Sequence, residues 1–125
     1  MSPLPGVEYR SFDGRRLPAT RGEPVGSEPV ADGWRAWDPR RSKVAAMMDR
    51  DLDLGVTPEG TILYLGAAAG TSVSHVADIA GPTYAVEFAP RPMRDLVAVA
   101  EARPTLFPLL KDARQPATYA HVVES

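Results

Sequence analysis

The segment from Leu63 to His75 constrains the fold of this chain more than any other part of it. An apolar run, Leu63-Tyr-Leu65, breaks into the small residues Gly66-Ala-Ala-Ala-Gly70 and resumes with a polar helical start, Thr71-Ser-Val-Ser-His75. This order predicts a strand, a tight turn and a helix N-terminus. In parallel α/β folds such a junction leaves backbone N–H groups at the strand ends, where a nucleotide-like ligand can approach closely. The segment therefore predicts a site for a nucleotide-type cofactor.

Strands and helices alternate around this junction. Strands are predicted over Thr61–Leu65, Thr83–Phe88 and Thr105–Leu110, with Pro108 as the weak point of the last. Helices are predicted over Thr71–Ala80, Pro90–Arg103 and Pro116–Val123. This order implies an α/β fold with a parallel sheet and right-handed crossovers. The nearly continuous apolar run in 61–65 predicts a strand that is buried on both faces.

The N-terminal part predicts a small antiparallel β unit. Val7–Phe12 alternates apolar and polar residues, and Asp13-Gly14 suits a hairpin turn. An edge strand is expected around Glu28–Val30. The composition changes at Trp34, so we expect a β-rich domain over residues 1–33 and a linking helix with an α/β domain over residues 34–125.

Ser42 or Asp38 can cap the linking helix. The helix is predicted to continue through Val44, Ala45, Met47, Met48 and Leu52. We expect Met47 and Met48 in the core, and Trp34 and Trp37 between the two domains rather than as exposed aromatic residues that stack on a ligand. His75 and His121 are interpreted as packed or capping residues rather than catalysts.

Composition excludes several classes of site. The chain has no cysteine, so disulfides and thiolate zinc sites are impossible, and two histidines make a poor metal cluster. The net charge of −2 and the pI of about 5.6 predict that any RNA contact is local or supplied by a partner. No apolar run approaches the roughly 20 residues of a membrane span, and the N-terminus lacks a secretory signal. We therefore expect a cytoplasmic location.

Two acidic residues narrow the ligand. Glu87 ends the second predicted strand, where an acid can accept hydrogen bonds from ribose hydroxyls. Asp112 follows the third strand and could accept from an adenine amino group. Together they describe an adenosyl ligand without a pyrophosphate, so S-adenosylmethionine fits better than a dinucleotide. The residues alone leave a second interpretation open, with solvated strand-end acids beside a tightly packed turn.

Four motifs, in order, resemble the archaeal fibrillarin family. They are Trp37–Lys43, Leu63–Asp78, Tyr84–Arg91 and Asp112–Arg114. The resemblance covers nearly the whole chain. It implies a small β domain followed by a Rossmann-like methyltransferase domain. It also implies transfer of a methyl group from S-adenosylmethionine to ribose 2′-hydroxyls of guide-selected rRNA and tRNA.

The resemblance also assigns roles to residues. The cofactor-binding residues expected from it and from the turn are Gly66, Ala67, Thr71, Ser72, Glu87, Phe88, Asp112 and Ala113. Phe88 would lie beside the adenine, and Thr71 and Ser72 near the methionine end. Ala69 stands where the family commonly has Ser, and Ser72 where it commonly has Thr. Both changes keep the site small, and Ser72 keeps a hydroxyl.

Lys43 matches the lysine of the family's catalytic group. A 2′-hydroxyl is a poor nucleophile near neutral pH, so an ammonium could orient it or stabilise the developing oxygen charge. Without the resemblance, a solvated surface lysine would be the simpler interpretation. The basic cluster formed by Arg35, Arg40, Arg41 and Lys43 is expected to make a local phosphate contact.

Box C/D guide RNA, a Nop5 (Nop56/58)-like scaffold protein and an L7Ae-like RNA-binding protein are the partners that the resemblance implies. The family pattern continues with a fourth strand, a catalytic Asp and a catalytic His, none of which lies before Ser125. We therefore expect a truncated chain that is marginally stable and inactive alone, with 61–65 as an exposed apolar edge. Two alternatives stay open: a non-catalytic ribonucleoprotein interaction module, and an unrelated small nucleotide-binding α/β protein.

Overall fold

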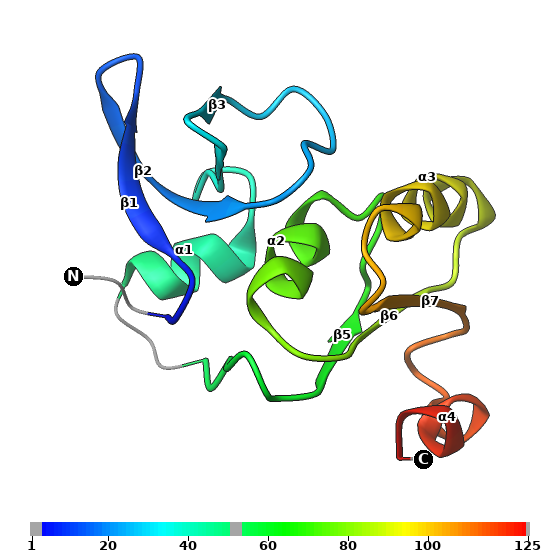
Figure 1. Ribbon diagram of the computed structural model, residues 1–125. Coiled ribbons are helices and arrows are strands. Elements are labelled where there is room, and N and C mark those ends of the chain that lie inside the picture. The colour runs from blue at the N-terminus through cyan, green and yellow to red at the C-terminus, as the bar shows by residue number, and fades with distance from the viewer. Residues whose placement is uncertain (1–3, 51–53, 125) are drawn as a thin grey trace.

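The computed structural model of the chain describes residues 4–50 and 54–124, which form two sheets connected by helices (Figure 1). The strands are β1 (Glu8–Phe12), β2 (Arg15–Arg21), β3 (Val30–Ala31), β4 (Trp34–Ala36), β5 (Ile62–Leu65), β6 (Thr83–Glu87) and β7 (Leu106–Leu110). The helices are α1 (Lys43–Asp49), α2 (Thr71–Ile79), α3 (Pro90–Glu101), the 3-10 turn η1 (Pro116–Thr118) and α4 (Ala120–Glu124). Leu52, predicted to be helical, lies outside the described residues. Of the helices in the described ranges, none has both the length and the apolar character needed to cross a bilayer.

The first sheet begins with the predicted hairpin. β1 and β2 pair in antiparallel orientation, and Asp13 and Gly14 join them. Both turn residues have positive φ, at 50° and 81°, as a type I′ turn requires. β4 pairs with β2 and β3 pairs with β4, so the strand order is β1-β2-β4-β3. β3 is thus an edge strand, as expected, although it begins only at Val30.

This sheet extends beyond the predicted domain boundary at Gly33. β4 pairs with both β2 and β3, so its residues belong to the β unit rather than to the linking segment. A strand of three residues is too short to show a clear period of two, and composition alone could not reveal it. We propose that the boundary between the two predicted domains follows Ala36.

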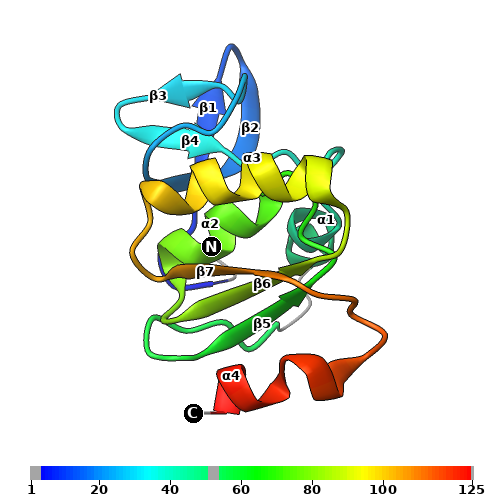
Figure 2. The ribbon, with the colours of Figure 1, turned by 90° about the vertical axis from the view of Figure 1, so that its right-hand side faces the viewer.

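The second sheet is parallel, with the order β5-β6-β7. Figure 2 shows α2 and α3 on one side of it and α4 on the other. The three strands lie within one residue of their predicted bounds. Pro108 is accommodated in β7 because this strand lies at an edge of the described sheet. The mixed architecture confirms the predicted fold class.

β5 is not buried on both faces, contrary to the prediction. Leu63 is 42% exposed and Leu65 is 50% exposed. Both lie on the side away from α2 and α3, in register with Tyr84 and Val86 of β6. β5 lies at the other edge of the described sheet. An exposed apolar edge was itself expected, and the described residues show one.

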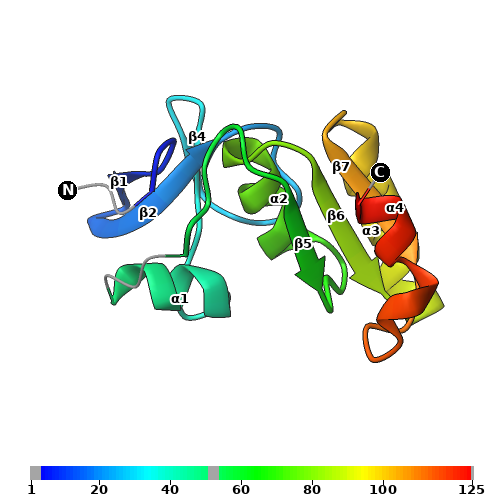
Figure 3. The same ribbon diagram turned by 90° about the horizontal axis from the view of Figure 1, so that it is seen from below.

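α2 lies between the two sheets (Figures 1 and 3). His75 of α2 is 1% exposed and stacks on Trp37, with ring centroids 5.0 Å apart. Both rings are therefore packed at this junction, as predicted. Trp34 instead packs within the first sheet, in a buried cluster with Phe12 and Leu17. The prediction that Trp34 packs between the domains is wrong.

One further packing prediction is wrong, and a second is wrong in part. Met47 is 42% exposed, whereas its neighbour Met48 is fully buried. α1 buries Ala45 and Met48, which lie three positions apart on one helix face, so Met47 points away from the core. His121 is exposed on α4, so it is not packed, but it lies in the last turn of the helix, where the capping role also predicted for it remains a prediction.

A buried ion network joins the first sheet to α2 and α3. The Arg35 side chain in β4 has no exposed surface, and its guanidinium donates to Glu28 at 2.9 Å and to Asp78 of α2 at 2.7 Å. Arg103, just after α3, donates to the same Asp78 at 3.1 Å. Arg35 is therefore unavailable for the phosphate contact predicted for it.

Candidate functional site

The predicted small-residue turn connects β5 to α2. The backbone N–H groups of Gly66 and Ala67 donate to the Val86 carbonyl of β6, with N···O distances of 2.9 and 3.0 Å. Gly66 and Gly70 have φ values of 71° and 101°, which L side chains rarely adopt. A Cβ on Gly66 would meet no atom within 4 Å. The backbone of the turn is thus held against β6 while the space beside Gly66 is open.

Glu87, at the end of β6, holds this turn. The Ala68 N–H donates to Glu87 Oε1 at 2.7 Å, and the Ala89 N–H donates to Oε2 at 3.0 Å. Ala68 has a φ of 51°, so the first bond helps to keep a non-glycine residue in a strained conformation. Each carboxylate oxygen retains a second acceptor site. Glu87 can therefore accept hydrogen bonds from ribose hydroxyls while it also holds the turn.

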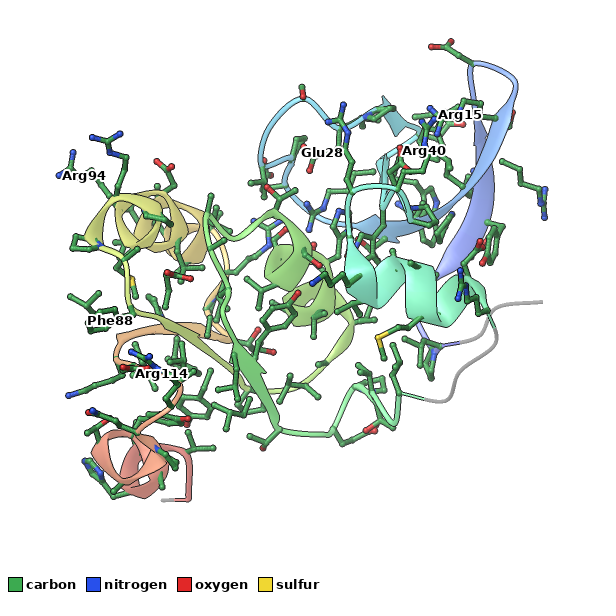
Figure 4. All side chains as sticks on the ribbon, turned by 180° about the vertical axis from the view of Figure 1, so that it is seen from behind. Arg15, Glu28, Arg40, Phe88, Arg94 and Arg114 are labelled. Carbon is green, nitrogen blue, oxygen red and sulfur yellow. The ribbon has the colours of Figure 1, made fainter. Side chains whose placement is uncertain are left out.

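Phe88 and Asp112 lie at the same ends of neighbouring strands. The Lys111 N–H donates to the Glu87 carbonyl at 3.2 Å, so the chain leaving β7 passes beside the end of β6. Phe88 is 64% exposed and offers an apolar face. Figure 4 shows Phe88 and Arg114 on the same side of the molecule.

Asp112 is already bonded within its own loop. The Arg114 guanidinium donates to it at 2.8 Å and the Arg114 backbone N–H at 2.9 Å. The guanidinium and then the backbone bond lower the pKa of Asp112. Arg114 thus competes for the oxygens predicted to accept from an adenine amino group. The carbonyl of Ala113 accepts from the Tyr119 hydroxyl at 2.8 Å.

Lys43 is the first residue of α1 and is exposed. Ser42 caps this helix, as predicted, by accepting from the Ala45 N–H at 3.2 Å. Ser42 also contacts the first turn of α2, because its Oγ lies 2.6 Å from Ser72 Oγ. The start of α1, where Lys43 lies, and the start of α2 are therefore adjacent.

A pocket of about 520 Å³ lies between the first sheet, the segment before α1 and the first turn of α2. Its lining residues are Arg15, Gly26, Ser27, Glu28, Pro29, Ala36, Trp37, Asp38, Arg40, Arg41, Ser42, Thr71, Ser72 and His75. A smaller pocket of about 350 Å³ lies between residues 23–25 and α3, and Thr71 also lines it. Neither pocket includes Glu87, Phe88 or Asp112. The predicted residues thus divide between a pocket rim, at Thr71 and Ser72, and an open strand-end edge.

Charged groups at the larger pocket are mostly paired. Arg40 and Arg15 both donate to Asp38 at 3.2 Å, and the Arg40 guanidinium is the main cause that lowers the pKa of Asp38 to about 2. Burial would raise the pKa of Glu28, but backbone N–H groups and Arg35 lower it to about 2. Arg41 is exposed, and no hydrogen bond or ion pair of its side chain is found in the described part of the chain. Figure 4 shows Arg15, Glu28 and Arg40 grouped beside the first sheet.

Two features of the site were missed by sequence reasoning. Ser42 was expected only as a helix cap, and its contact with Ser72 joins residues 30 positions apart. Tyr64 was expected only as a strand residue, yet its hydroxyl donates to Ser72 Oγ at 3.1 Å. Hydrophobic periodicity carries no signal for either contact, because both depend on how α1, α2 and β5 pack together.

Comparison with known proteins gives consistent matches. A family model described as Fibrillarin matches residues 12–125. A Halorubrum lacusprofundi protein named fibrillarin-like rRNA/tRNA 2′-O-methyltransferase is 66% identical over 120 residues, covering 96% of this chain and 57% of that protein. A Halobacterium salinarum protein of the same name is 64% identical over 126 residues, covering 100% of this chain and 60% of that protein. The chain thus spans 57–60% of the length of these relatives.

Two solved structures share the fold. A fibrillarin/Nop5p complex matches with a TM-score of 0.85 and 36% identity over 95% of this chain and 57% of that chain. An Aeropyrum pernix fibrillarin with natively bound S-adenosyl-L-methionine matches with a TM-score of 0.79 and 39% identity over 98% of this chain and 63% of that chain.

Proposed function

We propose, because this chain belongs to the fibrillarin family, that it forms the adenosyl-binding part of an S-adenosylmethionine-dependent rRNA and tRNA ribose 2′-O-methyltransferase. The family match rules out the alternative of an unrelated nucleotide-binding protein. The names of the relatives, and the S-adenosyl-L-methionine bound by the Aeropyrum pernix fibrillarin, support both the reaction and the cofactor.

One contact carries the cofactor proposal: the hydrogen bond from the Ala68 N–H to Glu87 Oε1 at 2.7 Å. It places an acid with remaining acceptor capacity directly against a small-residue turn at the ends of parallel strands. Such an edge is where α/β sheets bind nucleotides. The open space beside Gly66 and the exposed Phe88 ring also fit an adenosyl group. Asp112 fits less directly, because Arg114 must share its oxygens.

S-adenosylmethionine would supply an electrophilic methyl group, and Lys43 would act on the oxygen that receives it. Lys43 is the first residue of α1. The cap of this helix, Ser42, contacts Ser72 in α2. An ammonium at this place can orient a ribose 2′-hydroxyl and stabilise negative charge that develops on its oxygen.

The proposed RNA contact is formed by Arg40, Arg41 and Lys43, since Arg35 is buried. All three are exposed, around the start of α1. Target selection by box C/D guide RNA and assembly with a Nop5-like scaffold and an L7Ae-like protein are part of the proposal. The fibrillarin/Nop5p complex supports the scaffold partner.

The cofactor test measures S-adenosylmethionine binding by calorimetry. It uses a chimera in which this chain replaces the matching part of the Halorubrum lacusprofundi relative, since the chain spans 57% of that protein. We expect Glu87→Ala to weaken binding by at least about tenfold, because hydrogen bonds to a charged group are lost. Glu101→Ala, an exposed acid at the end of α3, is the matched control. Binding of the scaffold without any cofactor binding would instead support the non-catalytic interaction module.

The RNA test measures crosslinking of the same chimera to guide and target RNA in an assembled particle. Arg40→Gln with Arg41→Gln should weaken crosslinking and reduce its dependence on salt, because phosphate contacts release counterions. Arg94→Gln on α3 is the control, and Figure 4 shows it far from Arg40. Equal crosslinking by the double variant and the control would reject this RNA surface.

A further inference from the structure

Three hydroxyl groups from distant parts of the sequence meet beside the first turn of α2. Ser42 precedes α1, Tyr64 belongs to β5, and Ser72 is the second residue of α2. The Oγ atoms of Ser42 and Ser72 lie 2.6 Å apart, and the Tyr64 hydroxyl lies 3.1 Å from Ser72 Oγ. Ser42 is 7% exposed and Ser72 is half-buried, so protein groups dominate their hydrogen bonding.

The hydrogen-bond capacity of Ser42 leaves one direction for its proton. A hydroxyl has one O–H donor and two acceptor lone pairs. Ser42 Oγ accepts from the Trp37 indole N–H at 3.0 Å and from the Ala45 N–H at 3.2 Å. Both groups can only donate, so they occupy the two lone pairs. Ser42 must therefore donate its own proton to Ser72 Oγ.

The same reasoning applies one step further, at Ser72. Its Oγ accepts from Ser42 and from the Tyr64 hydroxyl, which occupies both lone pairs. Its own O–H is left to donate, and no acceptor for it is found within residues 4–50 and 54–124. The O–H of Ser72 is therefore a donor directed away from the network. Ser72 lies at the rim of the larger pocket.

We infer that Ser42 and Tyr64 are positioning residues, which orient the Ser72 hydroxyl as a donor to the carboxylate of the methionine group of S-adenosylmethionine. This inference rests on the proposed function. The methionine group carries a carboxylate, which only accepts, and an ammonium, which only donates. A hydroxyl whose lone pairs are both occupied can donate a hydrogen bond to the carboxylate but cannot accept one from the ammonium. The network thus determines which end of the methionine group faces α2.

The test compares two ligands by calorimetry on the chimera described above. S-adenosylmethionine carries the carboxylate, and 5′-methylthioadenosine lacks the amino-acid part. Ser72→Ala should weaken S-adenosylmethionine binding by about tenfold or more, as for a hydrogen bond to a charged group, and leave 5′-methylthioadenosine binding within about twofold. Tyr64→Phe and Ser42→Ala should weaken only S-adenosylmethionine binding, by roughly three- to tenfold.

Conservative and control variants separate positioning from folding. Ser42→Thr keeps the hydroxyl and should retain the affinity of the unmodified protein. Ser42→Ala also removes the α1 cap, whereas Tyr64→Phe does not, so Tyr64→Phe decides the matter if Ser42→Ala misfolds. Ser74→Ala is the matched control, because the Ser74 hydroxyl donates within α2 to the Thr71 carbonyl.

Two results would overturn the inference. One is an equal loss of affinity for both ligands in Ser72→Ala. The other is an unchanged affinity for S-adenosylmethionine in Tyr64→Phe. Failure of the proposed function gives a different result, namely no binding of either ligand by the unmodified protein. Glu87→Ala, which acts on the adenosyl part, should weaken both ligands together.

Discussion

At the scale of single residues, His75 shows how burial determines the state of a group. Its ring lies against Trp37, and its Nδ1 is 2.7 Å from Thr20 Oγ1. Burial, followed by the positive charge of Arg35, lowers the pKa of His75 from 6.5 to about 3. His75 is therefore neutral in the folded chain at neutral pH. Its contacts join β2, α2 and the segment before α1. Such a buried, neutral group is unsuited to a catalytic role.

This lowered pKa predicts a loss of stability in mild acid. Below pH 6.5 the unfolded chain protonates this histidine while the folded chain does not, so the free energy of unfolding falls as pH falls from about 6.5 towards 3. From pH 7 to pH 5 we expect a loss of about 1–2 kcal/mol, measured by urea unfolding. The lowered pKa values of Glu28 and Asp38 affect stability only below the ordinary pKa values of these groups, 4.5 and 3.8, and so outside the range from pH 7 to pH 5.

His75→Asn should flatten this pH dependence between pH 7 and pH 5 even if the variant is less stable overall. His121→Asn should keep the pH dependence of the unmodified chain, because His121 is the other, exposed histidine. An unchanged slope in His75→Asn would show that another group causes the acid sensitivity.

At the scale of elements, the turn between β5 and α2 combines two separate constraints on glycine. Gly66 needs glycine for its conformation alone, since a Cβ there would meet nothing within 4 Å. Gly70 also needs glycine for space, because a Cβ would lie 2.9 Å from Leu96 Cδ1 of α3. The second glycine therefore determines how closely α3 packs against the start of α2.

Alanine substitutions at these two positions should differ in cost. Gly66→Ala should lower the free energy of unfolding by about 1–2 kcal/mol, the cost of a left-handed conformation. Gly70→Ala should cost about 2–5 kcal/mol, because overpacking against Leu96 adds to the same strain. Urea unfolding of both variants tests this, and equal costs would mean that the Leu96 side chain moves aside without a cost.

At the scale of the whole molecule, polar contacts join the first sheet to the helices that cover the second, and apolar surface remains uncovered. Asp78 binds both Arg35 and Arg103, which connects β4, α2 and the segment just after α3 through buried charges. On the opposite side of the parallel sheet, Leu63 and Phe107 are both more than 40% exposed. An edge strand with exposed leucines is a template for pairing with another chain.

We expect this edge to cause self-association of the chain at high concentration. Leu63→Lys with Leu65→Lys should shift the sedimentation profile towards monomer, because charged side chains disfavour edge pairing. Val97→Lys, at a residue on α3 that is 43% exposed, is the control and should leave the profile unchanged. Association that persists in the double lysine variant would place the contact elsewhere.

The types and the order of most elements, and the end of the sheet where the candidate site lies, follow from the sequence alone. Local patterns suffice for this, because hairpin and strand–helix turns require particular small residues and parallel strands place their carboxyl ends at one edge. The positions of Glu87 and Asp112 follow from the strand ends alone. The short strand β4 was missed because three residues show no periodicity.

Which side chains meet depends on how the elements pack in three dimensions. Arg35 was interpreted as a surface cation, yet it is buried against Asp78, 43 positions away. Ser42 and Ser72 form one hydrogen-bond network although 30 residues separate them. Such contacts depend on the packing of elements that are distant in sequence, and no local pattern of polarity encodes that packing.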